Sequence, residues 1–270
     1  MYREKKYLVK EYIEKNRSES DIAKEWGIDP KLLHYYIKKN NLVGIKSRRK
    51  YTVDEGKLSM TDPVFCYYAG LIATDGYIDY KNHRVSLRVK NKGSKEVLQA
   101  LADYFSFTGS VKMYKGCYDL TITSDVLISK LGSLRVKDTE QGKKTYTLKF
   151  PAILPSSEDC QRMFVRGILD GDGNIHTYTS SYTNKVCGGQ FRIVTASHDF
   201  IAGLTRYINR KFGFEYKVSI AKLKGIEYPK LEMKVEDSKT FYKWLYKNFE
   251  EFRFSDKYNK YMLIVDEDIV

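Results

Sequence analysis

The chain has 270 residues, of which 42% are hydrophobic and 30% charged, and this length allows a full core and more than one domain. No apolar run approaches the length of a membrane span, and the start, MYREKKYLVK, lacks the apolar core of a signal peptide. We expect no membrane partner and a cytoplasmic, intracellular protein of bacterial or phage origin. The cysteines lie far apart without a CxxC pair, which favours reduced thiols over a zinc site or disulfides. They are Cys66, Cys117, Cys160 and Cys187.

The charge of the chain favours a polyanionic partner. The formal net charge is +13 and the isoelectric point is near 9.3. Residues 1–50 carry +7 of this charge and the remaining 220 residues carry +6. A positive field of this size attracts polyanions, and nucleic acid is the commonest of them.

Residues 20–40, SDIAKEWGIDPKLLHYYIKKN, predict two short helices joined by a turn. Gly27 ends the first helix, and Asp29 and Pro30 suit the N-cap and first position of the second. The apolar positions recur at helical spacing. They are Ile22, Ala23 and Trp26 in the first helix and Leu33 and Ile37 in the second.

An earlier helix, Lys6–Asn16, would complete a three-helix unit that resembles a helix-turn-helix. The second helix of such a unit lies in the major groove of DNA. Its exposed positions here would be Lys31, His34, Tyr35 and Lys38. The alternative is a helical hairpin with a solvated basic face. A basic linker follows at residues 46–60, and its cations suit contacts with phosphates. They are Lys46, Arg48, Arg49 and Lys50.

One short pattern occurs twice, 97 residues apart: Tyr68–Gly76 reads YAGLIATDG and Val165–Gly173 reads VRGILDGDG. The matching pairs, all at one offset, are Gly70 and Gly167, Asp75 and Asp172, Gly76 and Gly173, and Ile78 and Ile175. Each copy follows a helix start, at residues 61–63 and 156–159. We therefore expect two helices, which end near Asp75 and near Asp172.

Each of these motif helices has two distinct faces. One face is apolar and suits the core of its own half, through Tyr68, Leu71 and Ile72 in the first copy and Val165, Ile168 and Leu169 in the second. The other carries Cys66, Gly70 and Thr74, matched by Met163, Gly167 and Gly171. Small residues at this spacing let two helix backbones approach closely. We expect the helices to pack on each other at Gly70, Thr74, Gly167 and Gly171, which places Asp75 beside Asp172.

Strands with period two follow each motif helix, and helices lie between and after them. The expected strands are residues 84–90, 111–114 and 119–123 in the first copy and 190–193, 216–222 and 230–235 in the second. The expected helices are near residues 94–105, 125–131, 198–212 and 238–248. Both copies thus have the order αββαββα, with one sheet face apolar and packed on helices.

The other face of each sheet is polar and basic, and such a face can lie in a DNA groove. The residues expected to contact DNA are Arg84, Ser86, Arg88, Lys90 and Lys112 in the first copy and Gln190, Arg192, Lys217, Ser219 and Lys230 in the second. The alternative is a sheet face that is only solvated. The duplication and the charge together favour DNA.

Over residues 60–265 the chain resembles the LAGLIDADG homing endonuclease family in its single-chain, two-motif form. The resemblance rests on both motifs, their spacing, the repeated element order and the segment Lys143–Pro151, KKTYTLKFP. It implies an α+β fold in which two pseudo-symmetric αββαββα half-domains form a DNA-binding saddle, preceded by the small all-α helix-turn-helix domain. The chain departs from the family motif at Arg166, usually a small residue, and at Ala73, usually an acid.

The expected domain boundaries follow from this comparison. They are 1–45 for the helix-turn-helix, 46–60 for the basic linker, 61–140 for the first half, 141–155 for the linker between the halves and 156–270 for the second half.

The resemblance assigns metal binding to the last acid of each motif, Asp75 and Asp172, above the minor groove. Chemistry independently favours this, because carboxylates are hard ligands that suit Mg²⁺, and helix C-termini attract cations. The carbonyls of Gly76 and Gly173 are further candidate ligands. We expect two or more Mg²⁺ ions, with Mn²⁺ able to substitute. The alternative is two helix-end acids on a solvated surface.

Family members also place a lysine and an amide near the metal. Matching strand to strand gives Lys234 in PKLEMKVED, on the polar face with Lys230 and Glu232, whereas its first-half counterpart is Thr123. The water-positioning amide is Asn91, whose second-half counterpart is Ala196. Each group thus occurs in only one half, with Lys92 and Lys144 as alternatives. This asymmetry leaves nicking open beside double-strand cleavage.

The sequence therefore predicts a monomeric, site-specific homing endonuclease that hydrolyses both strands of a long pseudo-palindromic site in double-stranded DNA. Two other functions on the same scaffold stay open. One is a non-catalytic, DNA-binding transcription regulator, although such relatives tend to lose the two acids. The other is an RNA maturase. The target sequence and the genetic context, whether intron, intein or free-standing gene, are not fixed by the sequence.

Overall fold

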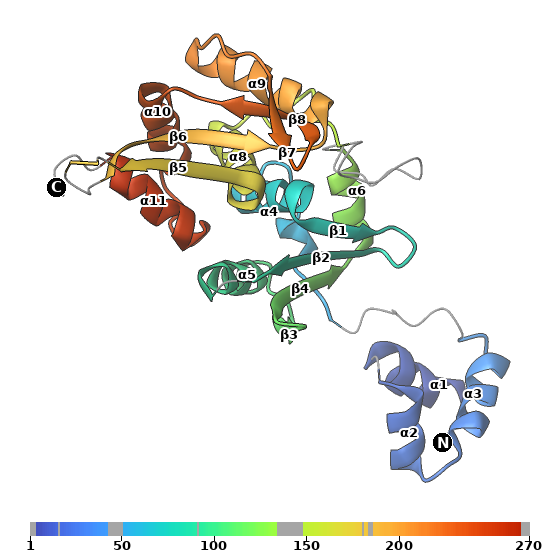
Figure 1. The fold of residues 1–270 in the computed structure, drawn as a ribbon. Coiled ribbons are helices and arrows are strands. Elements are labelled where there is room, and N and C mark those ends of the chain that lie inside the picture. The colour runs from blue at the N-terminus through green and yellow to red at the C-terminus, as the bar shows by residue number, and fades with distance from the viewer. Residues whose placement is uncertain are drawn as a thin grey trace. The chain divides into compact units, whose positions relative to one another are not determined.

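The structure is a computed structural model that describes residues 4–15, 17–42, 51–90, 92–133, 148–179, 181–182 and 186–265. The chain divides into two compact units, residues 1–51 and 52–270 (Figure 1). Each unit has a hydrophobic core of its own. Among the described helices, none is long and apolar enough to cross a membrane.

The elements described in the N-terminal unit are all helical. Its elements are α1 (Lys5–Leu8), the π-helical segment η1 (Val9–Glu14), α2 (Glu19–Trp26) and α3 (Pro30–Lys39). Ser18 caps α2 by accepting a bond from the Asp21 amide, and Asp29 caps α3 in the same way from Lys31. Gly27 has a φ of 64°, which favours glycine, and a Cβ there would meet no atom within 4 Å. Gly27 therefore serves the turn between α2 and α3.

Residues 52–60 differ from the linker expected at 46–60. The Thr52 amide donates to Thr108 Oγ1 at 2.8 Å, and Leu58 is buried in the core of the second unit. Between them lies the short 3-10 helix η2 (Glu55–Lys57). This segment therefore packs as part of the second unit. The cations Lys46, Arg48, Arg49 and Lys50 lie outside the described residues.

The second unit contains two four-stranded antiparallel sheets with the same strand order, β1-β2-β4-β3 and β5-β6-β8-β7. Elements of the first half are α4 (Pro63–Thr74), β1 (Gly76–Asp79), β2 (Arg84–Val89), α5 (Lys92–Tyr104), β3 (Lys112–Tyr114), β4 (Cys117–Thr123) and α6 (Asp125–Ser133). Elements of the second are α8 (Glu158–Asp172), β5 (Gly173–Thr179), β6 (Val186–Val194), α9 (His198–Phe212), β7 (Ser219–Leu223), β8 (Ile226–Glu232), α10 (Val235–Leu245) and α11 (Ser255–Val265). The order αββαββα is present in both halves.

Helices α4 and α8 lie side by side at the centre of this unit, with one sheet on each side of them (Figure 1). Both motif helices are buried along nearly their whole length. The core runs without interruption from the first sheet through α4 and α8 to the second sheet. This arrangement brings the two sequence motifs together.

The last two strands and the C-terminal helix differ from the sequence prediction. A turn with positive φ at Lys224 and Gly225 joins β7 to β8, so both strands lie within residues 219–232. Lys217 precedes β7, and Lys234 is the N-cap residue of α10. Helix α11 is an addition to the expected order, and it packs on β5, β6 and α5.

Candidate metal centre and nucleic-acid interface

The two motif helices cross at their glycines. A Cβ built on Gly70 would lie 3.0 Å from the Gly167 Cα, and a Cβ on Gly167 would lie 3.0 Å from the Gly70 Cα. A Cβ on Gly171 would lie 2.7 Å from the Thr74 Cβ. Only glycine therefore permits this approach, and the structure brings together all four residues expected at the interface.

The crossing places the two acids at one end of the helix pair. Asp75 is the C-cap residue of α4, and Asp172 is the last residue of α8. The Asp75 Oδ2 atom lies 3.4 Å from the position of a Cβ on Gly171, the neighbour of Asp172. Both acids are exposed. Gly76 and Gly173 begin β1 and β5 directly after them.

This donor set fits Mg²⁺. Carboxylate oxygens are the ligands that Mg²⁺ prefers, and the negative ends of two helix dipoles meet at the same place. Within the part of the chain that the structure describes, no group of three or more His, Cys, Asp or Glu side chains is arranged to hold a metal. The other ligands of an ion held by Asp75 and Asp172 would therefore be backbone carbonyls, water or phosphate.

Lys257, which the sequence analysis missed, lies beside the two acids. It comes from the first turn of α11, and its Nζ donates to the carbonyls of Leu169, Asp170 and Gly171 at 2.6, 2.6 and 2.9 Å. Burial lowers the pKa of Lys257, and the nearby carboxylates oppose this shift. Among those carboxylates are Asp75 and Asp172. A single ammonium group thus caps the end of α8 that carries Asp172, within electrostatic range of both acids.

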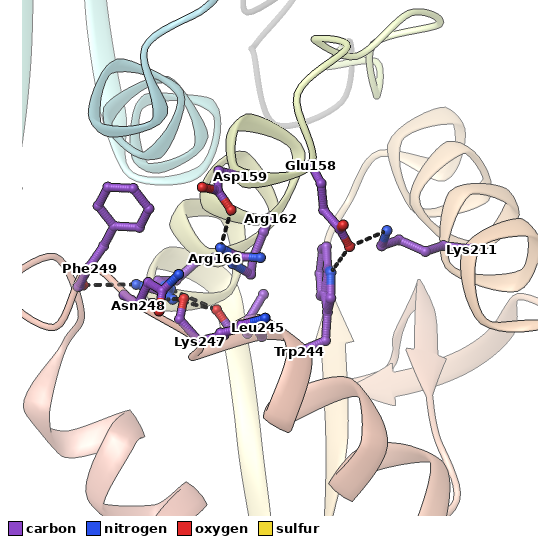
Figure 2. Close-up of polar contacts among 10 residues, drawn as sticks. All are labelled: Glu158, Asp159, Arg162, Arg166, Lys211, Trp244, Leu245, Lys247, Asn248 and Phe249. Atoms are coloured by element: carbon purple, nitrogen blue, oxygen red, sulfur yellow. Dashed lines mark hydrogen bonds and ion pairs between the residues drawn. The ribbon is translucent and has the colours of Figure 1, made fainter.

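Arg166 explains one departure from the motif. It is fully buried, and Figure 2 shows its guanidinium turned toward the chain after α10. Among the described residues it donates to backbone carbonyls, at 2.6 to 3.4 Å, and the acceptors are Leu245, Lys247, Asn248, Phe249 and Phe252. Asn248 and Phe249 have positive φ, which turns the carbonyls of this segment around the cation. Arg166 therefore holds the segment that leads into α11.

Asp170 anchors the same segment one helical turn later. Its buried carboxylate accepts bonds from the hydroxyls of Tyr67 and Tyr246, at 2.8 and 3.2 Å, and from the Phe254 amide at 3.0 Å. Burial raises its pKa, although Lys257, the Tyr67 hydroxyl, the Phe254 amide and Arg166 oppose the shift. The corresponding residue of the first motif is Ala73, which is buried among apolar residues. The acid is thus present in the half whose motif helix supports α11.

The opposite end of α8 is also fixed by charge. Glu158 accepts bonds from Lys211 of α9, at 2.9 Å, and from the Trp244 indole of α10, at 3.0 Å (Figure 2). Arg162, buried one turn later, pairs with Asp159. Charged groups therefore position α8 from its first turn to its last.

One other residue expected near the metal, Lys234, lies outside the strand predicted for it. Lys234 is exposed and lies outside β8, as the N-cap residue of α10. Its backbone amide donates to the Tyr216 hydroxyl at 2.8 Å rather than to a neighbouring strand. The strand expected over residues 230–235 therefore ends earlier, at Glu232, and the proposed role of Lys234 stays a prediction. Asn91 and Lys144, and the side chain of Lys92, lie outside the described residues.

The open face of the first sheet is polar, but its two arginines are paired with acids. The register places Arg84, Ser86 and Arg88 on one face with Asp79 and Asp119. Arg88 bonds Asp119, and Arg84 bonds Asp79 at 3.1 Å. Ser86 and Thr121 share a bond of 2.8 Å across β2 and β4. Lys90 and Lys112 are exposed beside them.

Cations on the open face of the second sheet are also paired with an acid. The Glu232 carboxylate bonds Arg192 and, at 2.6 Å, Lys230. Gln190 accepts a bond from the Tyr178 hydroxyl, and Lys217 and Ser219 are exposed near β7. The sequence alone missed these acids as partners, because strand register decides which charges face each other. Both open faces are therefore less basic than the expected faces.

Exposed aromatic residues accompany these charges. Tyr77 of β1 lies opposite Ser86 on the first open face and is 57% exposed. On the second, His176 and Tyr178 are in edge-to-face contact, with ring centroids 5.0 Å apart. The alternation of inward and outward side chains along β1 and β5 would have predicted that these aromatic residues lie on the open faces. Aromatic and amide groups of this kind can contact base edges or sugars.

In the N-terminal unit, all four residues expected to face DNA are exposed on α3: Lys31, His34, Tyr35 and Lys38. His34 Nδ1 lies 3.1 Å from Glu19 Oε2 of α2. Leu33 and Ile37 are buried on the other side of the helix. The helix therefore presents one apolar and one polar face.

A cavity of about 740 Å³ lies between residues 149–154 and α9. Its cations are Lys149, Arg206, Arg210 and Lys211. The motif helix contributes Gln161, which is eleven residues before Asp172, or roughly 16 Å along a helix. This cavity is therefore separate from the two acids.

Known structures with a similar arrangement include the homing endonuclease I-WcaI bound to its DNA recognition sequence, at 15% identity and a TM-score of 0.49, covering 82% of this chain and 96% of that one. The I-LtrWI LAGLIDADG homing endonuclease bound to target DNA has 12% identity and a TM-score of 0.46, over 77% and 91% of the two chains. The N-terminal LAGLIDADG domain of DUF199/WhiA has 15% identity and a TM-score of 0.45, over 72% and 86%.

These structural neighbours are thus LAGLIDADG homing endonucleases and the LAGLIDADG domain of WhiA, all at low identity. No family model matches the chain, and no curated protein sequence matches it. At identities of 12–15% and TM-scores below 0.5, these structures do not establish the activity of this chain. The activity therefore has to be argued from the residues of the chain itself.

Proposed function

We propose that the chain is a divalent-metal-dependent endonuclease that hydrolyses both strands of a long, specific site in double-stranded DNA. The observation that carries this proposal is the crossing of α4 and α8, which gathers Asp75 and Asp172 between two sheets with polar open faces. Both acids belong to one chain, so we propose that a monomer is active.

Asp75 and Asp172 would hold the Mg²⁺ ions, with the carbonyls of Gly76 and Gly173 as further ligands and Mn²⁺ as a substitute. Ions held there supply a water of lowered pKa and charge stabilisation at the leaving 3′ oxygen. Lys234 and Asn91 are proposed to act beside the acids, on the scissile phosphate and on the attacking water. Because Lys234 is exposed at a helix N-cap, its long side chain is free to reorient when DNA binds.

The open sheet faces would form a saddle that reads the DNA site, and the exposed face of α3 would extend the contact into a neighbouring major groove. Phosphate contacts give the bulk of such affinity and make it fall with salt. We propose intron homing as the biological role of a site-specific endonuclease of this kind.

A second function, DNA binding without cleavage, is favoured by one observation. Lys257 is fixed on the carbonyls at the end of α8 that carries Asp172, so its charge balances part of the charge of the two acids without any metal. Selection from a random double-stranded DNA library in Ca²⁺, followed by transfer of the bound DNA to Mg²⁺, distinguishes the two functions. Cuts in the selected DNA that EDTA prevents would support the endonuclease. Bound DNA that stays intact in Mg²⁺ and in Mn²⁺ would establish the second function instead.

Glu232→Gln is expected to strengthen the binding of non-specific DNA about threefold to tenfold at low salt. The change removes one negative charge and frees Arg192 and Lys230 for phosphates, so the dependence of log affinity on log salt should steepen by roughly one to two. Fluorescence anisotropy with a labelled duplex measures both quantities. Glu227→Gln, on the same strand and paired with Lys222 at 3.2 Å, is the matched control. Equal effects of the two variants would show that the second open face does not contact DNA.

A further inference from the structure

Three carbonyls in the last turn of α8 converge on Lys257. The distances from its Nζ are 2.6 Å to Leu169, 2.6 Å to Asp170 and 2.9 Å to Gly171. A lysine ammonium has three donors. All three are therefore directed at the helix end that carries Asp172, and Lys257 is fixed in place next to the candidate metal centre.

Negative charge accumulates at this point. Two helices end together, each with a dipole end equivalent to roughly half a negative charge, and each adds a carboxylate. The contact between Gly70 and Gly167 leaves the helices no room to shift apart without breaking the crossing. In the absence of metal, a fixed cation at this point reduces the repulsion between Asp75 and Asp172.

We propose that Lys257 is a resident cation of the metal centre, which stabilises the closed helix crossing when no metal is bound and weakens divalent-ion binding by repulsion. This inference rests on the proposed metal ligands Asp75 and Asp172. It assigns to α11, the helix added after the second αββαββα repeat, a role at the centre. Arg166 and Asp170 support that role by fixing the chain that leads from α10 to Lys257.

Asp170 is an alternative counter-ion for the Lys257 ammonium, in competition with Asp75 and Asp172. Its carboxylate already accepts bonds from Tyr67, Tyr246 and the Phe254 amide, and Lys257 touches its carbonyl instead. If Lys257 served only as a helix cap or as a counter-ion for Asp170, its removal would cost the same stability with or without metal. The metal dependence of the effect therefore separates the two roles.

The test compares melting temperatures and Ca²⁺ affinities of the full chain in EDTA and in Ca²⁺. Lys257→Gln keeps a hydrogen-bond donor and removes the charge, whereas Lys257→Arg keeps the charge. Lys57→Gln is the matched control, because Lys57 also donates to a carbonyl at a helix end, Tyr104 of α5, at 2.6 Å. Tyr104 bonds the N-cap residue of α4, at the far end of that helix from Asp75.

We expect Lys257→Gln to melt several degrees below the wild type in EDTA and to recover at least half of that loss in Ca²⁺. Its Ca²⁺ affinity should rise about tenfold, the effect of removing one positive charge several ångströms from a divalent ion in water-like surroundings. Lys257→Arg should resemble the wild type. Lys57→Gln should lose the same stability in both conditions.

An equal loss in EDTA and in Ca²⁺ for Lys257→Gln, with unchanged Ca²⁺ affinity, would overturn the inference. If this variant does not fold in EDTA, refolding yield with and without Ca²⁺ replaces the melting temperature, and equal yields overturn it. The wild type and Asp75→Asn/Asp172→Asn report on the metal site itself. A wild type that does not respond to Ca²⁺ contradicts the proposed metal ligands, whereas a wild-type response with no excess in Lys257→Gln contradicts only the role of Lys257.

Discussion

Asp75→Asn and Asp172→Asn are each expected to slow DNA cleavage by about a thousandfold and to change DNA affinity by only a few-fold. A metal ion contributes several kcal/mol of transition-state stabilisation, and each ~1.4 kcal/mol is a factor of ten in rate. Asparagine keeps the size and one oxygen of the side chain but removes the charge that holds the ion. Single-turnover cleavage of the selected DNA in Mg²⁺ gives the rate, and anisotropy in Ca²⁺ gives the affinity.

Asp199→Asn is the control for this prediction, because Asp199 is an exposed acid of α9 that pairs with Lys149 at 3.6 Å and lines the cavity that is separate from Asp75 and Asp172. Its cleavage rate should match that of the wild type. Full cleavage by Asp75→Asn or by Asp172→Asn would remove that residue from the metal centre.

Gly167→Ala is expected to destabilise the second unit by about 3 kcal/mol, the upper part of the usual range for overpacking. The new methyl would lie 2.8 Å from the Leu71 amide nitrogen and 3.0 Å from the Gly70 Cα, and backbone atoms cannot rotate away as a side chain does. For a unit of this size each kcal/mol shifts the melting temperature by roughly 2–4 °C, so a loss near 10 °C is expected. Cleavage should fall with it, because the crossing places Asp75 beside Asp172.

Gly188→Ala is the matched control, since its new methyl would lie 3.4 Å from Val235 Cγ1, an ordinary van der Waals contact. Thermal unfolding followed by circular dichroism compares the two variants. A Gly167→Ala protein that melts with the wild type would mean that the helices do not cross at this glycine.

Much of the fold follows from the sequence because the informative signals are local. The repeated motif and the caps at Asp62 and Ser157 predict α4 and α8, and the glycine spacing predicts their crossing. Alternation predicts β2 and β6 and the residues on their faces. These features depend only on residues that lie within a few positions of each other.

The parts that the sequence did not predict depend on distant residues. Lys257 acts on carbonyls 86 to 88 residues earlier, and Arg166 on carbonyls 79 to 86 residues later. No periodicity links such positions. The one available signal was chemical: Arg166 and Asp170, four residues apart, are charged residues within an apolar helix, and buried charges need partners. The strand predicted over residues 230–235 extended too far, because β8 ends at Glu232 and α10 begins at Val235.

The open faces show a similar limit. The sequence places Arg88 and Arg192 on polar strand faces, and the structure agrees. Their pairing with Asp119 and Glu232 depends on register between strands 31 and 40 residues apart. A count of basic residues therefore overestimates the positive charge that these faces offer to DNA.

The central claim, that two acids far apart in the chain share one metal centre, is tested most directly by Fe²⁺ in place of Mg²⁺. With ascorbate and peroxide, bound Fe²⁺ produces radicals that cut the polypeptide next to the ion, and mass spectrometry locates the cuts. We predict cuts both near Asp75 and near Asp172, and the loss of both in Asp75→Asn alone. Cuts near only one acid, or a variant that loses only the cut at its own position, would contradict a shared centre.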